Sequence, residues 1–255
     1  MESAAVDEYR LRRALVLSQI ASACQRVGRD PSRVHLLAVS KTVAPDQLRA
    51  AQAAGLTEFA ENRVQEAAAK IPLVPGVRWH LIGPLQSNKA RRAVELFATI
   101  QSVDSLELAE RLDQLVREIR GLSTSGGVPL EERLVLLLQV NVDDDPAKAG
   151  FAPAALSAAL PGLLALQALR IDGLMTIGRP VAQPEEARPT FRRLCHLATR
   201  LRAEQPGLGS ELSMGMSADY PIAVEEGATI VRVGRALFGD RAEAPDHRPA
   251  DGAPG

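Results

Sequence analysis

The sequence predicts a single (β/α)8 barrel, and two observations carry this prediction. Its 255 residues are the usual length for one such barrel. Eight short apolar runs also alternate with longer segments of helical periodicity, a pattern typical of parallel strands joined by right-handed helical crossovers. Because no glycine-rich dinucleotide turn follows the first run, a closed barrel is favoured over an open doubly wound sheet. We expect this one domain to span residues 1–240.

An amphipathic helix over residues 6–27 precedes the predicted barrel. Its apolar residues recur at helical spacing, and Gly28 follows as a stop signal. The recurring positions are Leu11, Leu15, Val16, Ile20, Ala23 and Val27. Acidic residues and arginines interrupt the apolar ones, so the segment has neither the core of a signal peptide nor that of a membrane span.

Each predicted strand is a short apolar run bounded by turn signals. In order, the runs are 34–40 (VHLLAVS), 57–60 (TEFA), 77–82 (VRWHLI), 98–103 (ATIQSV), 134–142 (LVLLLQVNV), 168–177 (ALRIDGLMTI), 210–214 (SELSM) and 229–233 (TIVRV). Helical periodicity predicts helices between them at 46–54, 62–71, 86–96, 105–120, 153–165, 185–204 and 218–227, with a short helix after the last strand.

Two segments lie outside this alternation. Residues 121–132 are rich in Gly, Ser and Pro and are expected to form a mobile loop between a helix and a strand. Residues 241–255 are expected to form a disordered carboxyl-terminal tail. Neither segment is predicted to carry chemistry.

Composition gives no indication of a nucleic-acid or membrane partner. Hydrophobic residues make up 46% and charged residues 24% of the chain, and the formal net charge is -1, so no strongly charged surface is expected. The two cysteines, Cys24 and Cys195, lie in helix-patterned segments without metal-ligand spacing. Buried free thiols are the favoured interpretation, and they indicate a reducing compartment and a cytoplasmic protein.

Chemistry in a barrel concentrates at the carboxyl ends of the strands, where the first predicted strand delivers Lys41. Low-dielectric surroundings disfavour the charged form of a lysine, and the neutral amine is a nucleophile toward aldehydes. This placement suits formation of a Schiff base. The alternative is a lysine that extends from a strand end into solvent, which is the commoner role for one such residue taken alone.

Two further polar residues belong to the second and third strands. Asn62 lies where the loop after the second run turns into a helix, which suits either a helix cap or a ligand. His80 lies within the third run, where a buried core histidine is the simpler explanation, although we keep it as a candidate. It has no partners at metal-ligand spacing, so no metal site is predicted.

The last two strands end in residues suited to an anion. The turn LSMGMS contributes Ser213, Gly215 and Ser217, and TIVRVG contributes Arg232 and Gly234. Small residues let backbone N–H groups approach closely, hydroxyls add donors and arginine adds a positive charge. Barrels often bind phosphate after strands seven and eight. These turns therefore predict a phosphate site, although each of them alone would also suit an ordinary tight turn.

A phosphate site combined with an aldehyde-reactive lysine matches one cofactor, pyridoxal 5′-phosphate (PLP), which is an aldehyde that bears a phosphate. The candidate cofactor-binding residues are Lys41, Asn62, His80, Ser213, Met216, Ser217, Arg232 and Gly234. No residue is assigned a catalytic role.

Five segments resemble the pyridoxal phosphate homeostasis proteins: LLAVSKT, FAENRVQE, WHLIGPLQSNK, GLMTIG and LSMGMSADYPIAVEEGATIVRVGRALFG. The resemblance covers nearly all of residues 6–240. It implies a fold-type III PLP barrel like the amino-terminal domain of alanine racemase, with Lys41 as the Schiff-base lysine. It also implies that Asn62 lies near the cofactor ring and Ser213 near the pyridine nitrogen. The residues that it places around the phosphate are Ser217, Arg232 and Gly234.

The resemblance further implies a PLP-binding protein of intracellular PLP (vitamin B6) homeostasis, with PLP-dependent apoenzymes as partners, rather than an enzyme. Alanine racemase uses a second acid/base tyrosine on an added β domain, and the chain ends soon after its eighth predicted strand. Of its two tyrosines, Tyr9 lies in the first helix and Tyr220 just after the seventh strand. Without the added domain we expect a monomer. The alternatives are a racemase-like PLP enzyme and a class I aldolase that uses Lys41 without a cofactor.

Overall fold

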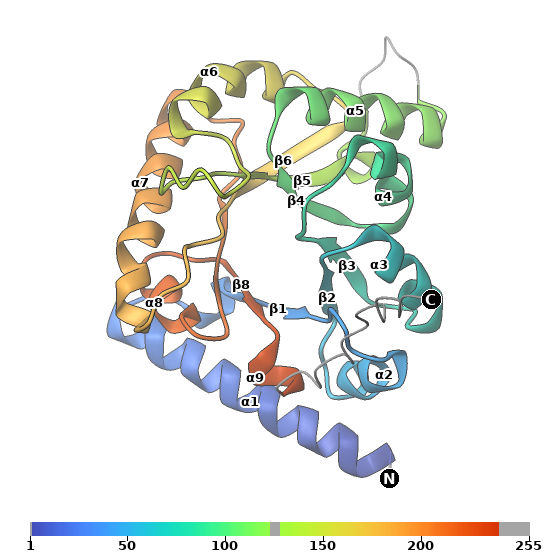
Figure 1. Cartoon of the computed structure of the whole chain (residues 1–255), viewed down its shortest axis with the longest axis vertical. Helices are drawn as coiled ribbons and strands as arrows, with labels where there is room; N and C mark the ends of the chain where they lie inside the picture. Colours follow the sequence, from blue (N-terminus) through green and yellow to red (C-terminus); the bar gives the residue numbers. More distant parts are fainter. Residues whose placement is uncertain (1, 123–127, 240–255) are drawn as a thin grey trace, which may run out of the picture.

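The computed structural model forms a closed barrel of parallel strands and describes residues 2–122 and 128–239 (Figure 1). Each strand pairs with the next one in the chain, and β8 returns to pair with β1. The strands are β1 (His35–Val39), β2 (Glu58–Glu61), β3 (Arg78–Leu81), β4 (Thr99–Val103), β5 (Leu134–Gln139), β6 (Leu169–Met175), β7 (Glu211–Met216) and β8 (Ile230–Val233). The predicted (β/α)8 fold is confirmed, and every strand end lies within three residues of its predicted position.

Helices form the outer layer around the strands (Figure 1). The α-helices are α1 (Glu2–Arg26), α2 (Pro45–Ala53), α3 (Val64–Lys70), α4 (Ala90–Leu96), α5 (Leu106–Arg120), α6 (Pro153–Leu164), α7 (Arg188–Glu204), α8 (Tyr220–Glu225) and α9 (Arg235–Phe238). Short 3-10 helices are η1 (Pro31–Arg33), η2 (Ile71–Leu73), η3 (Ser87–Lys89), η4 (Leu130–Glu132) and η5 (Pro184–Ala187). The extra amino-terminal helix, α1, packs against α2, α8 and α9.

Two predicted helices open with a 3-10 turn. The segments 86–96 and 185–204 open with the 3-10 helices η3 and η5, and regular α-helix starts only at α4 and α7. For α7 the reason is Pro189, which stands in the first turn of the helix. Proline is tolerated there because it lacks an N–H, but an earlier helix start would set its ring against the preceding turn.

The predicted mobile loop at 121–132 has structure at one end. Its last residues form η4 before β5 begins, so that part of the loop prediction is wrong. The middle of the loop, 123–127, lies outside the described residues, and so does the predicted tail at 241–255.

The buried face of α1 differs from its predicted apolar stripe. Val16, Ile20 and Ala23 are buried, as their spacing suggests, but Leu11 and Leu15 are 72% and 61% exposed. Helical geometry places Leu11 about 140° around the helix from Val16. Since α1 rests on α2, α8 and α9 through the side that carries Val16, the two leucines face away from the barrel.

The strands separate two apolar cores, because successive side chains on a strand point to opposite faces. The larger core lies between strands and helices and includes Phe59, Ile100 and Leu136. The smaller core fills the inside of the barrel with Leu37, Ala60, Ile82, Leu137, Met175 and Ile230. Buried polar residues accompany these cores, among them His80, Gln101, Ser213 and Arg232. Polar groups buried at such depth require hydrogen-bond partners.

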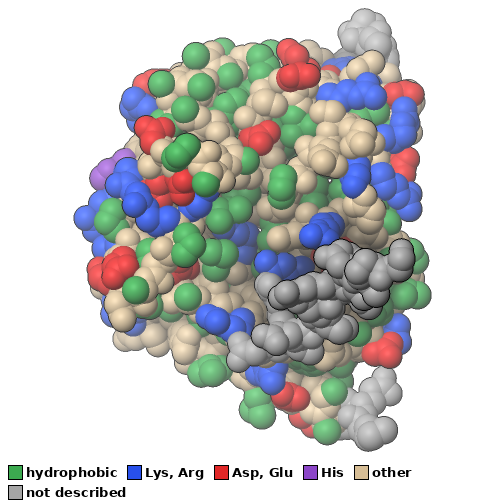
Figure 2. Space-filling model, viewed as in Figure 1, with side chains coloured by type: hydrophobic (Ala, Val, Ile, Leu, Met, Phe, Trp, Pro, Cys, Tyr) green, Lys and Arg blue, Asp and Glu red, His purple; other side chains and the backbone are tan. Residues whose placement is uncertain are grey.

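The two cysteines differ in burial. Cys24 is buried and burial raises the pKa of its thiol, whereas Cys195 is only half-buried, so the prediction of two buried free thiols is right only for Cys24. Figure 2 shows Lys/Arg and Asp/Glu side chains interspersed around the rim of one face, with a few basic side chains near its centre. Among the described helices none is both long and apolar enough to cross a membrane.

Candidate functional site

The ends of β1 and β8 bring two parts of the predicted site together. Lys41 is half-buried and lies two residues beyond β1, in a turn closed by a 3.0 Å hydrogen bond from Val43 N–H to Ser40 O. Gly234 follows β8 and packs on the end of β1, because a Cβ placed on it would lie only 3.3 Å from Val39 O. The turn of Lys41 and the backbone at Gly234 therefore share one part of the barrel mouth.

Donor groups converge beside Gly234. The Ser217 hydroxyl oxygen accepts hydrogen bonds from Gly234 N–H at 3.1 Å and from Ala236 N–H at 3.5 Å. The last residues of β7 include Gly215, whose φ is +87° and where a Cβ would lie 2.5 Å from Ala223 Cβ, so the strand end requires glycine. Two backbone N–H groups and one partly exposed hydroxyl thus meet at the mouth, an arrangement that suits an anionic oxygen.

Beneath these groups a chain of hydrogen bonds crosses the inside of the barrel. Arg232 donates from Nη1 to Ser213 Oγ at 2.8 Å and from Nη2 to Thr176 O at 2.8 Å. Ser213 Oγ lies 2.6 Å from Gln101 Oε1, and Gln101 Nε2 lies 3.1 Å from His80 Nδ1. Because arginine only donates, the Ser213 hydroxyl oxygen accepts from Arg232, and the hydroxyl donates a hydrogen bond to Gln101 Oε1. Gln101 then donates to His80, which fixes the remaining proton of that imidazole on Nε2.

Burial sets the charge states in this chain. Complete burial lowers the pKa of Arg232 to about 10, partly opposed by the negative charge of Asp219, and the guanidinium stays charged at neutral pH. Burial, with the positive charges of Arg78 and His35, lowers the pKa of His80 to about 3, so the imidazole is neutral. Its Nε2 lies 3.6 Å from Glu58 Oε2 and has no hydrogen-bond partner. This contact is too long for a hydrogen bond, and the neutral ring forms no ion pair there.

The loops after β2, β3 and β7 complete the mouth. Asn62 directly follows β2, and Gly83 comes so close to it that a Cβ on Gly83 would lie 2.2 Å from Asn62 O. Ser102 Oγ fixes the same loop by donating to Gly83 O at 2.6 Å. Met216 is 41% exposed at the rim, and its backbone N–H donates to the Asp219 carboxylate at 2.6 Å. Asn62 and Met216 therefore lie at the edge of the site.

The predicted residues fall into two levels. The mouth contains the half-buried or exposed residues Lys41, Asn62, Met216, Ser217 and Gly234. The buried level below contains Ser213 and Arg232, with His80 linked to them through Gln101. Any contribution of His80 to a ligand therefore runs through other side chains.

Sequence reasoning missed Gln101 and Thr176, which complete the buried hydrogen bonds of Arg232 and Ser213. For Gln101 the available signal was a polar side chain inside the apolar run ATIQSV, because buried polar groups need partners. Thr176 accepts from Arg232 through its backbone carbonyl, which its residue type does not reveal. Sequence reasoning also missed the charged residues Glu61, Glu66 and Lys70, which contact the turn around Lys41.

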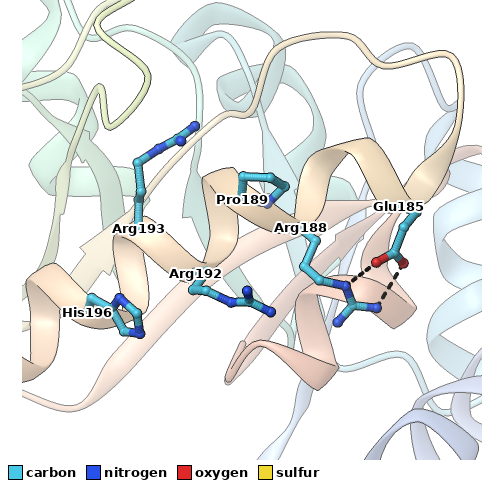
Figure 3. Close-up of a pocket in the computed structure, with 6 residues that line it drawn as sticks. All are labelled: Glu185, Arg188, Pro189, Arg192, Arg193 and His196. Atoms are coloured by element: carbon cyan, nitrogen blue, oxygen red, sulfur yellow. Dashed lines mark hydrogen bonds and ion pairs between the residues drawn. The ribbon is translucent and has the colours of Figure 1, made fainter.

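A surface hollow on α7 lies outside the barrel mouth. Figure 3 shows the side chains that line it: Glu185, Arg188, Pro189, Arg192, Arg193 and His196. Arg188 forms ion pairs with Glu225 at 2.7 Å and with Glu226 at 2.8 Å, so its charge is already neutralised by protein groups.

Within the described parts of the chain, no group of three or more His, Cys, Asp or Glu side chains could hold a metal ion.

Fold and site together define a (β/α)8 barrel protein with a candidate ligand site at the carboxyl ends of its strands. A family model, the alanine racemase amino-terminal domain, matches residues 16–242. Among curated relatives, proteins from Synechocystis sp. and Pseudomonas aeruginosa, both named pyridoxal phosphate homeostasis protein, are 42% and 43% identical to this chain. The alignments cover 83% and 89% of this chain and 93% and 94% of those proteins. The chain therefore belongs to the pyridoxal phosphate homeostasis proteins, within the family of alanine racemase amino-terminal domains.

Solved structures agree with this assignment. PipY of Synechococcus elongatus, solved with PLP bound, is 44% identical with a TM-score of 0.74, and the match covers 88% of this chain and 100% of that one. The same protein without PLP has a TM-score of 0.75 at 45% identity, covering 88% of this chain and 99% of that one. Alanine racemase of Clostridium difficile 630, at 15% identity and a TM-score of 0.68, shares the fold; the match covers 96% of this chain and 58% of that one.

Proposed function

We propose that this protein binds PLP at the barrel mouth through a covalent bond to Lys41 and takes part in PLP homeostasis. The observation that supports it most directly is the position of Lys41 beside the donor groups at Gly234 and Ser217. PipY, at 44% identity, was solved with PLP bound, and the curated relatives are named for PLP homeostasis.

The residues beside Gly234 fit a phosphate group. The N–H groups of Gly234 and Ala236 and the hydroxyl of Ser217 can all donate, and the two N–H groups meet the Ser217 oxygen rather than a carboxylate of the described residues. Both N–H groups donate to the Ser217 oxygen, which therefore marks the place where they hold an acceptor. The resemblance implies a place around the phosphate for Arg232, but its guanidinium donates to Ser213 and to Thr176 O in the level below. We assign Arg232 to the side of the cofactor ring, where it holds Ser213 in place.

Lys41 supplies the reactive amine. When bound, PLP provides an aldehyde that condenses with a primary amine and releases water. The amine must carry a lone pair to react, and the half-buried position of Lys41 near the apolar wall of the barrel reduces solvation of the ammonium form. Asn62 and Met216, at the edge of the site, would border the cofactor.

We further propose that the protein holds PLP without amino-acid turnover. Neither tyrosine of the sequence lies at the mouth: Tyr9 packs on Phe238 with ring centroids 5.7 Å apart, and Tyr220 donates its hydroxyl proton to Gln19 on α1. A racemase needs an acid/base group on each face of the cofactor. Transfer of PLP to apoenzymes and a monomeric state stay predictions.

The first test is an absorbance spectrum of the purified protein with PLP, before and after borohydride reduction, followed by peptide mass mapping. We expect a reducible absorbance band and a pyridoxyl group on Lys41 alone. Lys41→Ala serves as the control and should retain only weaker, noncovalent binding through the donor groups at Gly234. A pyridoxyl group on Lys89 or another lysine instead would contradict the proposed site.

The two enzymatic alternatives are separated by activity. A panel of D- and L-amino acids should show no conversion above that of Lys41→Ala, and robust conversion that depends on Lys41 would favour a racemase-like enzyme. A protein that shows no absorbance change with PLP, yet forms a borohydride-trapped adduct with a simple aldehyde or ketone substrate at Lys41, would favour a class I aldolase.

A further inference from the structure

A buried ion-pair cluster lies behind the turn of Lys41. Glu61 ends β2, and Glu66 and Lys70 lie one turn apart on α3. Lys70 Nζ is 2.8 Å from Glu61 Oε1 and 2.6 Å from Glu66 Oε1. The side chains of Lys70 and Glu61 are only 9% and 0% exposed. Burying these charges is costly even when they are paired, so the cluster is a weak source of stability and a specific role is the better explanation.

The cluster holds both peptide groups that flank Lys41. Lys70 Nζ donates to the carbonyl oxygen of Ser40 at 2.8 Å, which fixes the peptide before Lys41. The backbone N–H of Thr42 donates to Glu66 Oε1 at 2.6 Å, which fixes the peptide after it. Both are charge-assisted hydrogen bonds, the stronger class. The backbone of Lys41 cannot turn without breaking one of them.

The backbone conformation indicates that these contacts impose the turn. Thr42 has φ +66°, a left-handed conformation that a β-branched residue rarely adopts and that persists only where surrounding contacts determine it. Burial would raise the pKa of Glu66, but hydrogen bonds from Lys70 and Thr42 outweigh this and hold the pKa below its usual value. Glu66 is therefore ionised at neutral pH and remains a strong acceptor for Thr42 N–H.

We propose that Glu66 and Lys70 are positioning residues that hold the backbone of Lys41 so that its amine is directed at a ligand in the barrel mouth. This inference rests on the proposed function. A nucleophile held in its reactive geometry loses little conformational freedom on reaction, which speeds bond formation. The cluster lies outside the barrel wall and holds the two peptide groups beside Lys41, so neither residue needs to touch PLP.

The test is the rate of covalent PLP attachment, followed by stopped-flow absorbance with full-length protein. Glu66→Ala removes the acceptor of Thr42 N–H but leaves Lys70 paired with Glu61. We expect the attachment rate constant to fall about tenfold or more, because small displacements of a reacting group have large effects on rate. Glu66→Gln keeps a side-chain oxygen for Thr42 and should recover most of the rate.

Asp113→Ala is the matched control. Asp113 also forms an i,i+4 ion pair on its helix, with Arg117 at 2.8 Å, and also accepts a backbone N–H, from Ala168 at 2.7 Å. This second clamp precedes β6, at the opposite end of the barrel from Lys41. We expect the wild-type attachment rate from Asp113→Ala. Thermal denaturation of each variant checks that it is folded.

A second measurement separates positioning from a general structural role. In the Lys41→Ala background, Glu66→Ala should change noncovalent PLP affinity by less than about twofold, because its effect requires the lysine. A wild-type attachment rate in Glu66→Ala, or an affinity loss that persists without Lys41, would overturn the positioning role alone. Absence of any reducible link in the wild type would overturn the proposed function as well.

Discussion

Arg232 and His80 lie at the two ends of one buried hydrogen-bond chain, and their charges differ because burial lowers the pKa of two groups whose ordinary values differ. Arg232 keeps its proton because burial lowers its pKa only to about 10, and the charged guanidinium donates to Ser213 and to the Thr176 carbonyl. His80 receives a hydrogen bond from Gln101 at Nδ1 and lies among buried groups, and burial together with Arg78 and His35 lowers its pKa to about 3. A protonated His80 would lose this bond, because both of its nitrogens would then be donors.

The low pKa of His80 predicts a loss of stability in mild acid. The unfolded chain binds a proton at His80 near pH 6.5, but the folded chain does so only near pH 3. The free energy of unfolding should therefore fall as pH decreases through this window, by about 2 kcal/mol between pH 7 and pH 5 from this group. Urea unfolding at the two pH values measures the loss. In His80→Asn, whose Oδ1 can accept from Gln101, the loss should be smaller by that amount.

The control for this measurement is His196→Asn, because His196 is exposed on α7. It should show the same pH dependence as the wild type. Identical slopes for wild type and His80→Asn would mean that His80 has about the same pKa in the native and unfolded states, which contradicts its burial in the hydrogen-bond chain described here.

At the scale of the elements, helix boundaries follow local sequence. In α5, Ser105 Oγ accepts the backbone N–H of Leu108 at 3.2 Å, and Gly121 ends the helix with φ +63°. A serine cap satisfies one of the unpaired donors of the first turn, and glycine adopts the left-handed conformation without a Cβ penalty. These two residues explain why the predicted helix at 105–120 agrees with α5 within one residue.

Ser105→Ala should destabilise the fold by about 1 kcal/mol, because the Leu108 N–H loses its acceptor. A thermal melt should show a decrease of about 2–4 °C in Tm for a chain of this size. Ser157→Ala is the comparison, since Ser157 lies inside α6 and donates to its own helix at Pro153 O. Its Tm should change by less than half as much. A larger effect at Ser157 than at Ser105 would count against the capping role.

At the scale of the whole molecule, the barrel closes through positions that admit no side chain. Gly173 on β6 pairs with Glu211 on β7, and a Cβ on Gly173 would lie 1.9 Å from Glu211 O. One atom of this clash is the backbone oxygen of Glu211, and the other is a Cβ fixed to the backbone of β6. Neither can move unless the two strands separate. Closure at β6 and β7 also determines where Ser213 and Ser217 lie.

Gly173→Ala should therefore lower the free energy of unfolding by about 3 kcal/mol through overpacking. Gly207→Ala is the matched control, because its Cβ would make only ordinary contact, 3.6 Å from the Leu164 side chain. Urea denaturation should show a lower midpoint for the first variant and no loss for the second. Equal midpoints would show that the β6–β7 pairing can widen at little cost.

The alternation of apolar runs and helical periods determined the fold class, the number of strands and the order of the site residues, because these depend on local pattern. It also placed Lys41, Ser217 and Gly234 at strand ends, since a barrel gathers all such ends at one mouth. For this reason the mouth could be predicted without knowing how the helices pack.

Only the tertiary structure decided which residues meet across the barrel. Gln101 contacts Ser213 across 112 positions of sequence, and α1 turned Leu11 outward because of what its other face rests on. The clamp on Lys41 formed by Glu66 and Lys70 likewise depends on how α3 packs behind β1 and β2. Strand periodicity predicts whether a side chain faces the inside or the outside of the barrel. Contacts between distant strands depend on the register and closure of the barrel, which cannot be predicted from any single segment of the sequence.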